Sequence, residues 1–573
     1  MAVENLNPKA LNDLGDACFY GINRSTNLEL AYTYYKQAAD MDNPVGYFNM
    51  GNYFMVKKDY KQALLNYEKA RAYQYSPASI TLARLYQEGD GVKKNKTKAF
   101  KYLLGAAKLN DPDAFNAVGE CYNKGVGTKK DIEKAFEFFQ KSADLNNATG
   151  QLNVGLYHLN HKNFAKNPEN AIHWLDKAAM NGDLTAMKTL YTLYKEGKIA
   201  YFKNKSLAYL QEMAFYYLEM MAKAKDPMAL KICAKTFYEG NQVTRRNYEK
   251  ACSYYQTLHD MGDIEGKYGY GVCLLYGQGT KQNIELAKTL FEQCSQDKHP
   301  QALGKLGDIY RMGMKTAVDA EKAKKYYMEA SRLQDLESLL NLGLLNYREQ
   351  IENHSPALAY SYMETAAKKG YFQAMYWLGI FHDIGVGCTA SFKEAEKWFE
   401  KAIKAGSVGS KYKYGAMILD KIEHQKINSK KKIAYYQRAR KLMIEYCLDP
   451  QHSQSNHAYA MHYLGMIYKQ GLGIEVSDRT ARYWFEMAAT TGLSKSMVEV
   501  HLYLKGKEPI PSLKWLKDAL KDTQCSEALY EMGNLYLEGY GSLIESDIKQ
   551  AKFYYEQAAR LNHPQALEKL MMN

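Results

Sequence analysis

The sequence predicts an all-α solenoid of about fifteen helix hairpins, and three observations indicate this class. The 573 residues exceed the roughly 250–300 that one hydrophobic core can serve. A content of 46% hydrophobic residues with only 12 prolines excludes a disordered or collagen-like chain. A short phrase also recurs at a nearly constant interval. Together these features favour an array of small stacked units over one globule.

The recurring phrase is Ala-x-x-x-Leu-Gly, and its copies are most often 36 residues apart. A partial sixteenth copy begins at Ala566. The final position of the phrase falls at residues 15, 51, 83, 119, 155, 191, 234, 271, 307, 343, 379, 415, 465, 501 and 533. Each copy is followed by a second apolar run with helical spacing. Each unit is therefore predicted to be a hairpin of a first helix (helix A) and a second helix (helix B).

The fourth copy shows how the elements follow one another. Helix A is predicted over 113–122, a turn follows at Gly125-Val-Gly127, and helix B is predicted over 131–143. Glycine suits such a turn because it adopts a positive φ without steric cost. One hairpin cannot bury its apolar face alone, so stacked neighbours are required.

Helix B carries an aromatic residue four positions before an alanine, which places a large and a small side chain on one helix face. The pairs are Tyr34/Ala38, Trp174/Ala178, Trp398/Ala402, Trp484/Ala488, Trp515/Ala519 and Tyr554/Ala558. This face is predicted to pack against neighbouring helices.

Irregular spacing suggests a domain organisation. The sixth unit is seven residues longer than the usual one, with the extra chain at 197–210, and the twelfth is fourteen longer. In the twelfth unit, 421–432 and 448–456 have room for loops. We predict amino-terminal repeats at 1–195 with a polar inner wall, central repeats at 196–420, an extended insertion at 421–456, and carboxy-terminal repeats with a capping helix at 457–573.

Composition limits the location and the partners. No apolar run approaches the roughly 18 residues of a membrane helix, and the start does not resemble a secretory signal. The nine cysteines are scattered without a Cys-x-x-Cys pair, as is usual for buried thiols in a reducing compartment. We therefore expect a cytoplasmic protein. The net charge of +13 is a mild bias for this length.

No pattern indicates catalysis. The sequence lacks a phosphate-binding loop, a His-Glu-x-x-His zinc motif and a Gly-x-Ser-x-Gly nucleophile turn. His158 with His161, and His452 with His457 and His462, lack the companions that would complete a metal site. We expect a protein that is not an enzyme, without cofactor, metal or small-molecule substrate.

These units resemble the Sel1-like repeat family, a relative of the tetratricopeptide repeats. The eleventh copy carries the resemblance most fully, with the phrase and turn at 374–387 and Lys393-Glu-Ala-Glu-Lys-Trp-Phe-Glu-Lys-Ala in helix B. The resemblance implies a right-handed α-solenoid that acts as a protein-binding scaffold or adaptor. It also permits a regulatory subunit or effector that controls a bound enzyme, and secretion into a host by a non-classical route.

The docking surface is predicted from positions on helix A. At about 100° per residue, positions −2, +1 and +5 from the phrase's glycine lie opposite the packed stripe. The resemblance implies that this side lines the concave wall. In the amino-terminal units these positions are polar and include Asn49, Asn52 and Asn153.

From the eighth unit onward the same positions are apolar, which is typical of interaction sites. The predicted partner-binding residues there are Val272, Tyr276, Met312, Leu344, Trp377, Ile380, Ile384, Tyr463 and Met466. Trp377 is distinctive because the other four tryptophans all stand in helix B. We expect another protein or peptide as the partner.

RNA binding is the alternative from another class. The basic cluster of Lys430 to Lys432, Arg438, Arg440 and Lys441 could attract phosphate. Repeat proteins that recognise RNA carry base-reading residues at a fixed place in each unit. No such column is present, so a nucleic-acid partner is not expected.

Overall fold

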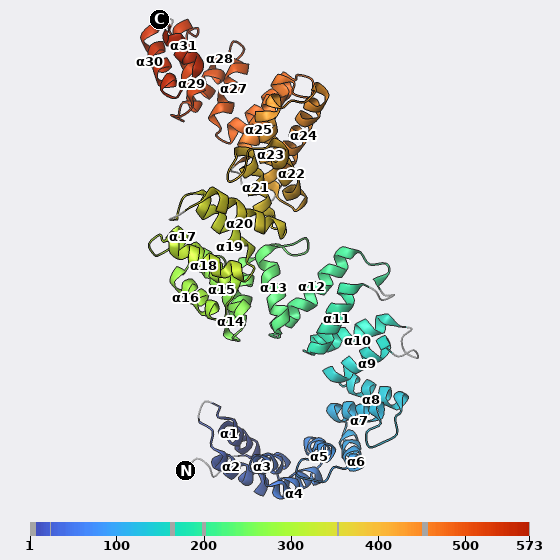
Figure 1. Cartoon of the computed structure of the whole chain (residues 1–573). Coiled ribbons are helices and arrows are strands. Elements are labelled where there is room, and N and C mark those ends of the chain that lie inside the picture. Colours follow the sequence, from blue (N-terminus) through green and yellow to red (C-terminus); the bar gives the residue numbers. More distant parts are fainter. Residues whose placement is uncertain are drawn as a thin grey trace. The chain divides into compact units, whose positions relative to one another are not determined.

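The computed structural model describes residues 7–22, 25–160, 167–197, 202–351, 354–449 and 456–571. Helices dominate throughout, and the described residues contain no strand beyond an isolated bridge between Tyr540 and Ile544 (Figure 1). The all-α prediction is confirmed. The chain forms two compact units, unit 1 ending at Asn283 and unit 2 beginning at Ile284.

Odd-numbered helices are the first and even-numbered helices the second of each predicted hairpin. Unit 1 contains α1 (Pro8–Tyr20), α2 (Leu28–Asp40), α3 (Pro44–Val56), α4 (Tyr60–Ala72), α5 (Ser76–Glu88), α6 (Lys96–Ala107), α7 (Pro112–Lys124), α8 (Ile132–Asp144), α9 (Ala148–Asn160), α10 (Pro168–Met180), α11 (Leu184–Glu196), α12 (Leu207–Lys223), α13 (Pro227–Glu239), α14 (Tyr248–Asp260) and α15 (Ile264–Tyr276). Within unit 1 each helix packs on the next along the chain.

Unit 2 continues the same alternation. It contains α16 (Ile284–Gln296), α17 (Pro300–Met312), α18 (Ala320–Arg332), α19 (Leu336–Tyr347), α20 (Pro356–Lys368), α21 (Phe372–Ile384), α22 (Phe392–Lys404), α23 (Val408–Lys421), the 3₁₀ turn η2 (Ile422–His424), α24 (Ser429–Cys447), α25 (His457–Gln470), α26 (Asp478–Thr490), α27 (Ser494–Leu504), α28 (Pro509–Ala519), α29 (Ser526–Glu538), α30 (Ile548–Arg560) and α31 (Pro564–Met571). The short α31 is the first helix of the partial sixteenth copy.

The sequence fixes helix ends through local hydrogen bonds. At the start of α7, Asp111 Oδ1 accepts from the backbone N–H of Ala114 at 2.9 Å, while Pro112 occupies the first turn. At its end Gly125 takes φ +70° and its N–H bonds to the carbonyl of Cys121. The helices predicted at 113–122 and 131–143 are confirmed to within two residues at each end.

The second turn glycine serves a different purpose. A Cβ on Gly127 would collide with the backbone carbonyl oxygen of Lys96, at the start of the preceding helix B. Gly387 meets the carbonyl of Pro356 in the same way. The turn of one hairpin is therefore seated on the backbone of the hairpin before it, and only glycine allows that approach.

The glycine of the repeated phrase lies under an aromatic ring of its own hairpin. A Cβ on Gly379 would stand 2.6 Å from the Phe399 ring, and one on Gly307 would stand 2.5 Å from Tyr327. Phe399 follows Trp398 of the sequence pattern by one position, and Tyr327 follows Tyr326 in the same way. Phe485 is fully buried, whereas the neighbouring Trp484 of the predicted column is only half-buried. The deepest knob of helix B is therefore the second aromatic of each doublet.

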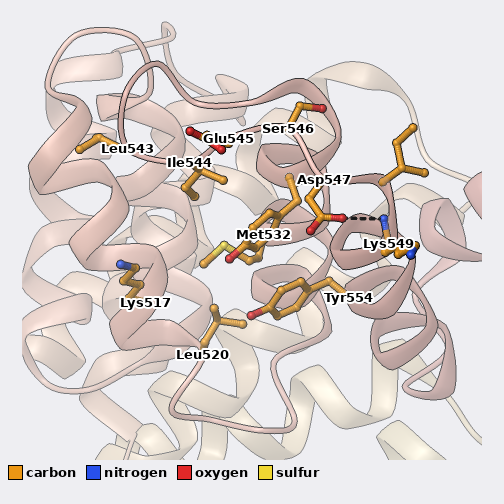
Figure 2. A pocket seen from close by; sticks show the side chains of 12 residues that line it. Lys517, Leu520, Met532, Leu543, Ile544, Glu545, Ser546, Asp547, Lys549 and Tyr554 are labelled. Carbon is orange, nitrogen blue, oxygen red and sulfur yellow. Dashed lines mark hydrogen bonds between the residues drawn. The ribbon is translucent and has the colours of Figure 1, made fainter.

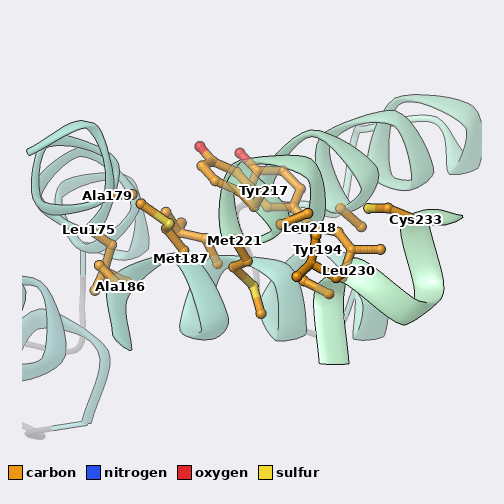
Figure 3. Packing of buried hydrophobic residues seen from close by; sticks show 14 of the residues in the cluster. Leu175, Ala179, Ala186, Met187, Tyr194, Tyr217, Leu218, Met221, Leu230 and Cys233 are labelled. Atoms are coloured by element: carbon orange, nitrogen blue, oxygen red, sulfur yellow. The ribbon is translucent and has the colours of Figure 1, made fainter. Parts of the chain in front are cut away.

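The apolar core runs along the helices instead of forming one central cluster. One group of buried side chains extends from Leu152 in α9 to Leu258 in α14. Figure 3 shows part of it, where the rings of Tyr194 and Tyr217 stack with centroids 5.6 Å apart above Met187 and Met221. The three hairpins from α9 to α14 thus share one continuous core.

The longer units use part of their extra residues in helices. Helix α12 has 17 residues and α24 has 19, whereas most helices have 13. The loop predicted at 421–432 is partly helical, because Lys421 ends α23, η2 follows, and 429–432 belong to α24. Residues 450–455 of the other predicted loop and 198–201 of the extra chain lie outside the described residues. The boundaries of the four predicted domains stay predictions.

Replacing Gly379 with alanine tests the glycine–ring packing. Gly379→Ala should lower the free energy of unfolding by about 1–3 kcal/mol because the added Cβ forces the Phe399 ring to shift. The third copy has Ala83 and Leu103 at the same two positions. Gly379→Ala with Phe399→Leu should therefore recover part of the loss in urea unfolding. A double variant less stable than Gly379→Ala alone would contradict this packing scheme.

Acid should loosen the end of unit 2 through His501, which replaces the usual glycine. Its fully buried imidazole has Nδ1 2.8 Å from Ser512 Oγ, and burial lowers the His501 pKa to about 4. A lowered histidine pKa favours the neutral folded form, so this contribution is complete above about pH 6.5 and is lost as the pH falls towards 4. The loss should reach up to about 3 kcal/mol.

Amide hydrogen exchange of α27 and α28 between pH 7 and 4, corrected for intrinsic exchange rates, measures this effect. The variant His501→Gln keeps a hydrogen-bonding group but does not titrate in this range, so its protection should depend less on pH. An equally steep dependence in both proteins would exclude His501 as the cause.

Candidate partner-binding surface

Successive helices A present positions −2 and +1 to each other within each unit. In unit 1, Asn49 Nδ2 of α3 lies 3.4 Å from Asp16 Oδ1 of α1. In unit 2, Asn341 Nδ2 of α19 lies 3.2 Å from Asp308 Oδ1 of α17. Positions −2 and +1 of successive helices A therefore lie on one face in each unit, and position +5 lies one turn further along the same face of each helix. We call the surface formed by these three positions the helix-A surface.

The predicted polar residues form hydrogen bonds with other side chains of the same chain. Asn49 is only 8% exposed and also donates to Asn12 Oδ1 at 3.3 Å. Asn52 accepts from the Tyr67 hydroxyl at 2.8 Å, and Asn153 donates to Asn116 at 2.8 Å. Asn49 and Asn153 thus join consecutive repeats, and Asn52 joins the two helices of one hairpin.

The type of residue at position +1 depends on the helix-B side chain that covers the glycine of the repeated phrase. Where that side chain is tyrosine, its hydroxyl donates to an Asp or Asn at +1. The pairs are Tyr35–Asp16 at 2.8 Å, Tyr67–Asn52 at 2.8 Å, Tyr327–Asp308 at 2.7 Å and Tyr555–Asn534 at 2.8 Å. Burial raises the pKa of Tyr67 to about 12, which keeps its hydroxyl a donor.

Where helix B supplies a side chain without a hydroxyl, position +1 is usually apolar. Ile380 accompanies Phe399, Met466 accompanies Phe485, and Leu344 accompanies Met363. Glu120, which accompanies Phe139, is an exception. Part of the apolar character predicted as a binding signal therefore reflects the packing partner on helix B.

The predicted apolar residues differ widely in exposure. Tyr276, Met312 and Ile384, all at +5, are 42%, 42% and 53% exposed. Val272 is buried at 9% exposure, and the others are half-buried: Leu344, Trp377, Ile380, Tyr463 and Met466. Val272 and Tyr276 belong to unit 1, whereas the other seven belong to unit 2.

Trp377 takes part in packing as well as in the surface. Its ring centroid lies 5.8 Å from that of Tyr347 in α19 and 6.2 Å from that of Phe381 in α21. The indole thus joins two consecutive helices A, with Leu344 packed against the same cluster. Ile384 lies one turn beyond Ile380, so the exposed part of this surface continues along α21.

Sequence reasoning missed two exposed apolar residues at +5 in the first repeats. Tyr20 is 66% exposed and Val56 is 53% exposed, at the ends of α1 and α3. Applying the +5 spacing to the first two copies would have identified both. The amino-terminal helix-A surface is therefore not uniformly polar.

One carboxyl group lies within the apolar part of unit 2. Burial and the neighbouring Asp383 raise the pKa of Asp420, which also stands at +5. Lys421 pairs with the carboxylate of Asp383, because its Nζ lies 2.6 Å from Asp383 Oδ1. The surface therefore presents only a small net charge at α21 and α23.

A hollow of about 310 Å³ continues the helix-A surface from Met466 to α31. Its charges are paired across repeats, with Lys495 3.2 Å from Glu527 and Lys505 3.7 Å from Glu531. Burial lowers the pKa of His462 to about 4, so this imidazole is neutral at pH 7. The hollow offers hydrogen-bonding groups without a strong electrostatic field.

A larger hollow of about 770 Å³ lies among α28, α29, α30 and the 539–547 connection. Figure 2 shows Leu520, Met532 and Tyr554 beside Asp547, whose Oδ1 accepts from the backbone N–H of Lys549 at 2.9 Å. Asp547 thereby caps α30. The acidic group has a structural role, and the lining shows no nucleophile paired with a base.

Within the described part of the chain, no group of three or more His, Cys, Asp or Glu side chains is arranged to hold a metal. None of the helices described there has the length and apolar character of a membrane span. Two histidines named above, His161 and His452, lie outside the described residues.

The Sel1 repeat pattern matches thirteen segments that together cover most of the sequence. They are residues 8–43, 45–72, 77–111, 112–147, 148–183, 199–226, 229–263, 264–295, 300–335, 336–371, 372–407, 458–492 and 526–563. The chain belongs to the Sel1 repeat family. The hairpins α23–α24 and α27–α28 fall outside these matches but continue the same alternation.

Several curated proteins share part of this Sel1 repeat sequence. Mouse DAP3-binding cell death enhancer 1 is 26% identical over 173 residues, which is 30% of this chain and 34% of that protein. Chitin synthase regulatory factor 2 of Schizosaccharomyces pombe is 23% identical over 206 residues, 34% of this chain and 40% of that protein. The chain thus spans well under half the length of either relative.

Solved structures include other Sel1-like proteins. The protective antigen c5321 of uropathogenic Escherichia coli aligns with 82% of this chain and 97% of its own, at 18% identity and a TM-score of 0.42. A Sel1 repeat protein of Oxalobacter formigenes aligns with 57% of this chain and 91% of its own, at 19% identity and a TM-score of 0.38.

A double-mutant cycle tests the pairing at +1. Tyr67→Phe and Asn52→Leu should each lower the free energy of unfolding by about 1 kcal/mol, because each leaves one partner of the 2.8 Å bond unsatisfied. The double variant should be destabilised by less than the sum of both losses. Strict additivity in urea unfolding would contradict an energetic coupling.

Proposed function

We propose that this Sel1 repeat protein is a non-enzymatic scaffold or adaptor that holds a partner protein on the helix-A surface. Repeats of this type generally mediate interactions between proteins. The observation that supports the site is the exposure of Met312 and Ile384, which both stand at position +5 of a helix A, in α17 and α21 of unit 2. Exposed methionine and branched aliphatic side chains in line favour contact with an apolar protein segment.

The half-buried residues of this surface are held in place by packing. Trp377 and Leu344 pack on the core of α19 to α21, so they lose little side-chain freedom when a partner covers them. Met312 and Ile384 project further and supply the exposed apolar area. A helix or an extended peptide crossing successive helices A would contact both kinds of residue.

Control of a bound enzyme is the second candidate. The fission yeast relative is named a regulatory factor of chitin synthase, which makes an enzyme a reasonable class of partner. An activity assay on the captured partner, with and without this chain, distinguishes regulation from passive assembly.

The basic cluster gives little support to RNA binding. Lys432 Nζ lies 2.7 Å from Glu423, and Arg438 lies 3.8 Å from Glu400. Lys441 lies 3.9 Å from Glu445. These neighbouring carboxylates reduce the field that a phosphate backbone would meet.

Charge substitutions at the exposed positions test the proposed surface. Met312→Glu with Ile384→Glu should lower capture of protein partners at least tenfold, because partner binding would bury both carboxylates. Quantitative mass spectrometry after affinity purification from cell extract measures the loss.

Leu358→Glu with Val476→Glu is the matched control. Both residues are exposed and apolar in unit 2 but lie outside the −2, +1 and +5 positions. These substitutions should leave the captured proteins unchanged. Equal capture by both double variants, with melting temperatures like that of the wild type, would remove the helix-A surface of unit 2 from consideration.

A further inference from the structure

Helix B of the third hairpin contains a glycine that no contact within the chain requires. Gly105 lies in α6, and a Cβ there would meet no atom within 4 Å. By contrast, a Cβ on Gly119 would stand 2.7 Å from the Phe139 ring. Glycine inside a helix lowers its stability relative to alanine. The absence of a side chain at Gly105 keeps an outward-facing space open.

This space is an apolar hollow of about 480 Å³ that we call the α6 hollow. Phe115 of α7 and Phe138 of α8 lie at its base, with ring centroids 6.1 Å apart. The complete lining is Lys101, Leu104, Gly105, Ala107, Lys108, Phe115 and Phe138. Its volume leaves room for a large apolar side chain.

Other repeats place a lysine where the third repeat has Gly105. Lys141, Lys177 and Lys401 each lie over an aromatic ring three residues earlier in the same helix, at 5.1, 4.6 and 4.2 Å from its centroid. The aliphatic stem of such a lysine covers the outer surface of helix B. Gly105 has no side chain to cover the corresponding surface of α6, which lines the hollow together with Phe115 and Phe138.

The segment around the hollow is strongly basic. Residues 91 to 110 contain six lysines and no aspartate or glutamate. Lys96 and Lys98 occupy the first turn of α6, where the helix dipole disfavours cations. Lys101 and Lys108 are exposed and lie on the same helix face as Gly105, because residues three and four positions apart are neighbours. The charge therefore borders the hollow on two sides.

We propose that the α6 hollow docks an acidic segment of a partner protein. One large apolar side chain of that segment fills the space above Phe115 and Phe138, and flanking carboxylates pair with Lys101 and Lys108. The charge of residues 91 to 110 selects an acidic partner, and the apolar base selects a peptide over a nucleic acid. This surface lies on α6, a helix B, and is separate from the helix-A surface.

Peptide binding to the full-length chain tests this proposal. The probe is a fluorescein-labelled 12-residue peptide of glutamates around a central Leu-Phe pair, measured by fluorescence anisotropy. Gly105→Leu should weaken its binding at least tenfold by filling the hollow. Lys101→Glu with Lys108→Glu should weaken it at least as much, and added salt should reduce the wild-type affinity.

Helix α18 in unit 2 provides a matched control. Lys325 and Arg332 stand at the positions of Lys101 and Lys108, but Glu329 replaces the glycine. Lys325→Glu with Arg332→Glu should leave the affinity for the probe unchanged. Gly105→Leu should keep a melting temperature at or above that of the wild type, because the added side chain meets open space.

Several outcomes would overturn the proposal. They are the absence of binding to the wild-type chain, equal affinity of wild type and Gly105→Leu, and equal affinity for a probe with Ala-Ala in place of Leu-Phe. A fourth is displacement of the probe by a single-stranded oligonucleotide at lower concentration than by unlabelled peptide, which would make α6 a general polyanion site.

Discussion

The close approach of helix A and helix B is the constraint on which the rest of the structure depends. In hairpin after hairpin a ring from helix B rests where helix A has only a hydrogen atom, as Phe399 does on Gly379. This contact fixes the distance between the two helices and the rotation of each about its axis. The remaining faces of helix A are then free to carry either packing or binding residues.

The same contact explains how position +1 varies along the chain. A tyrosine hydroxyl brought beside helix A needs an acceptor, and Asp308 provides one for Tyr327 at 2.7 Å. A phenylalanine brings no such need, so Ile380 can stand beside Phe399. The identity of a surface residue on one helix is thus linked to a buried residue on the other.

Sequence reasoning recovered the helix hairpins, their glycine turns and the positions of successive helices A that lie next to each other. These features depend on local periodicity, which a single chain displays directly. It did not recover which members of that face are exposed, because Val272 and Ile384 differ only through the neighbours that cover them. The hollow beside Gly105 was also missed, since it depends on Phe115 and Phe138 meeting across two helices.

The seat of Gly127 on the backbone of Lys96 gives the array a direction. At Gly127, Gly279 and Gly387 the later hairpin supplies the glycine and its predecessor supplies the backbone carbonyl, so the two ends of a block bounded by such contacts are chemically different. A block cut at such a contact begins with an unpaired turn glycine and ends with an uncovered helix start. Each of these ends fits the opposite end of another block cut in the same way. Gain or loss of whole repeats can therefore proceed without remaking the joint, which makes the hairpin a natural unit of duplication.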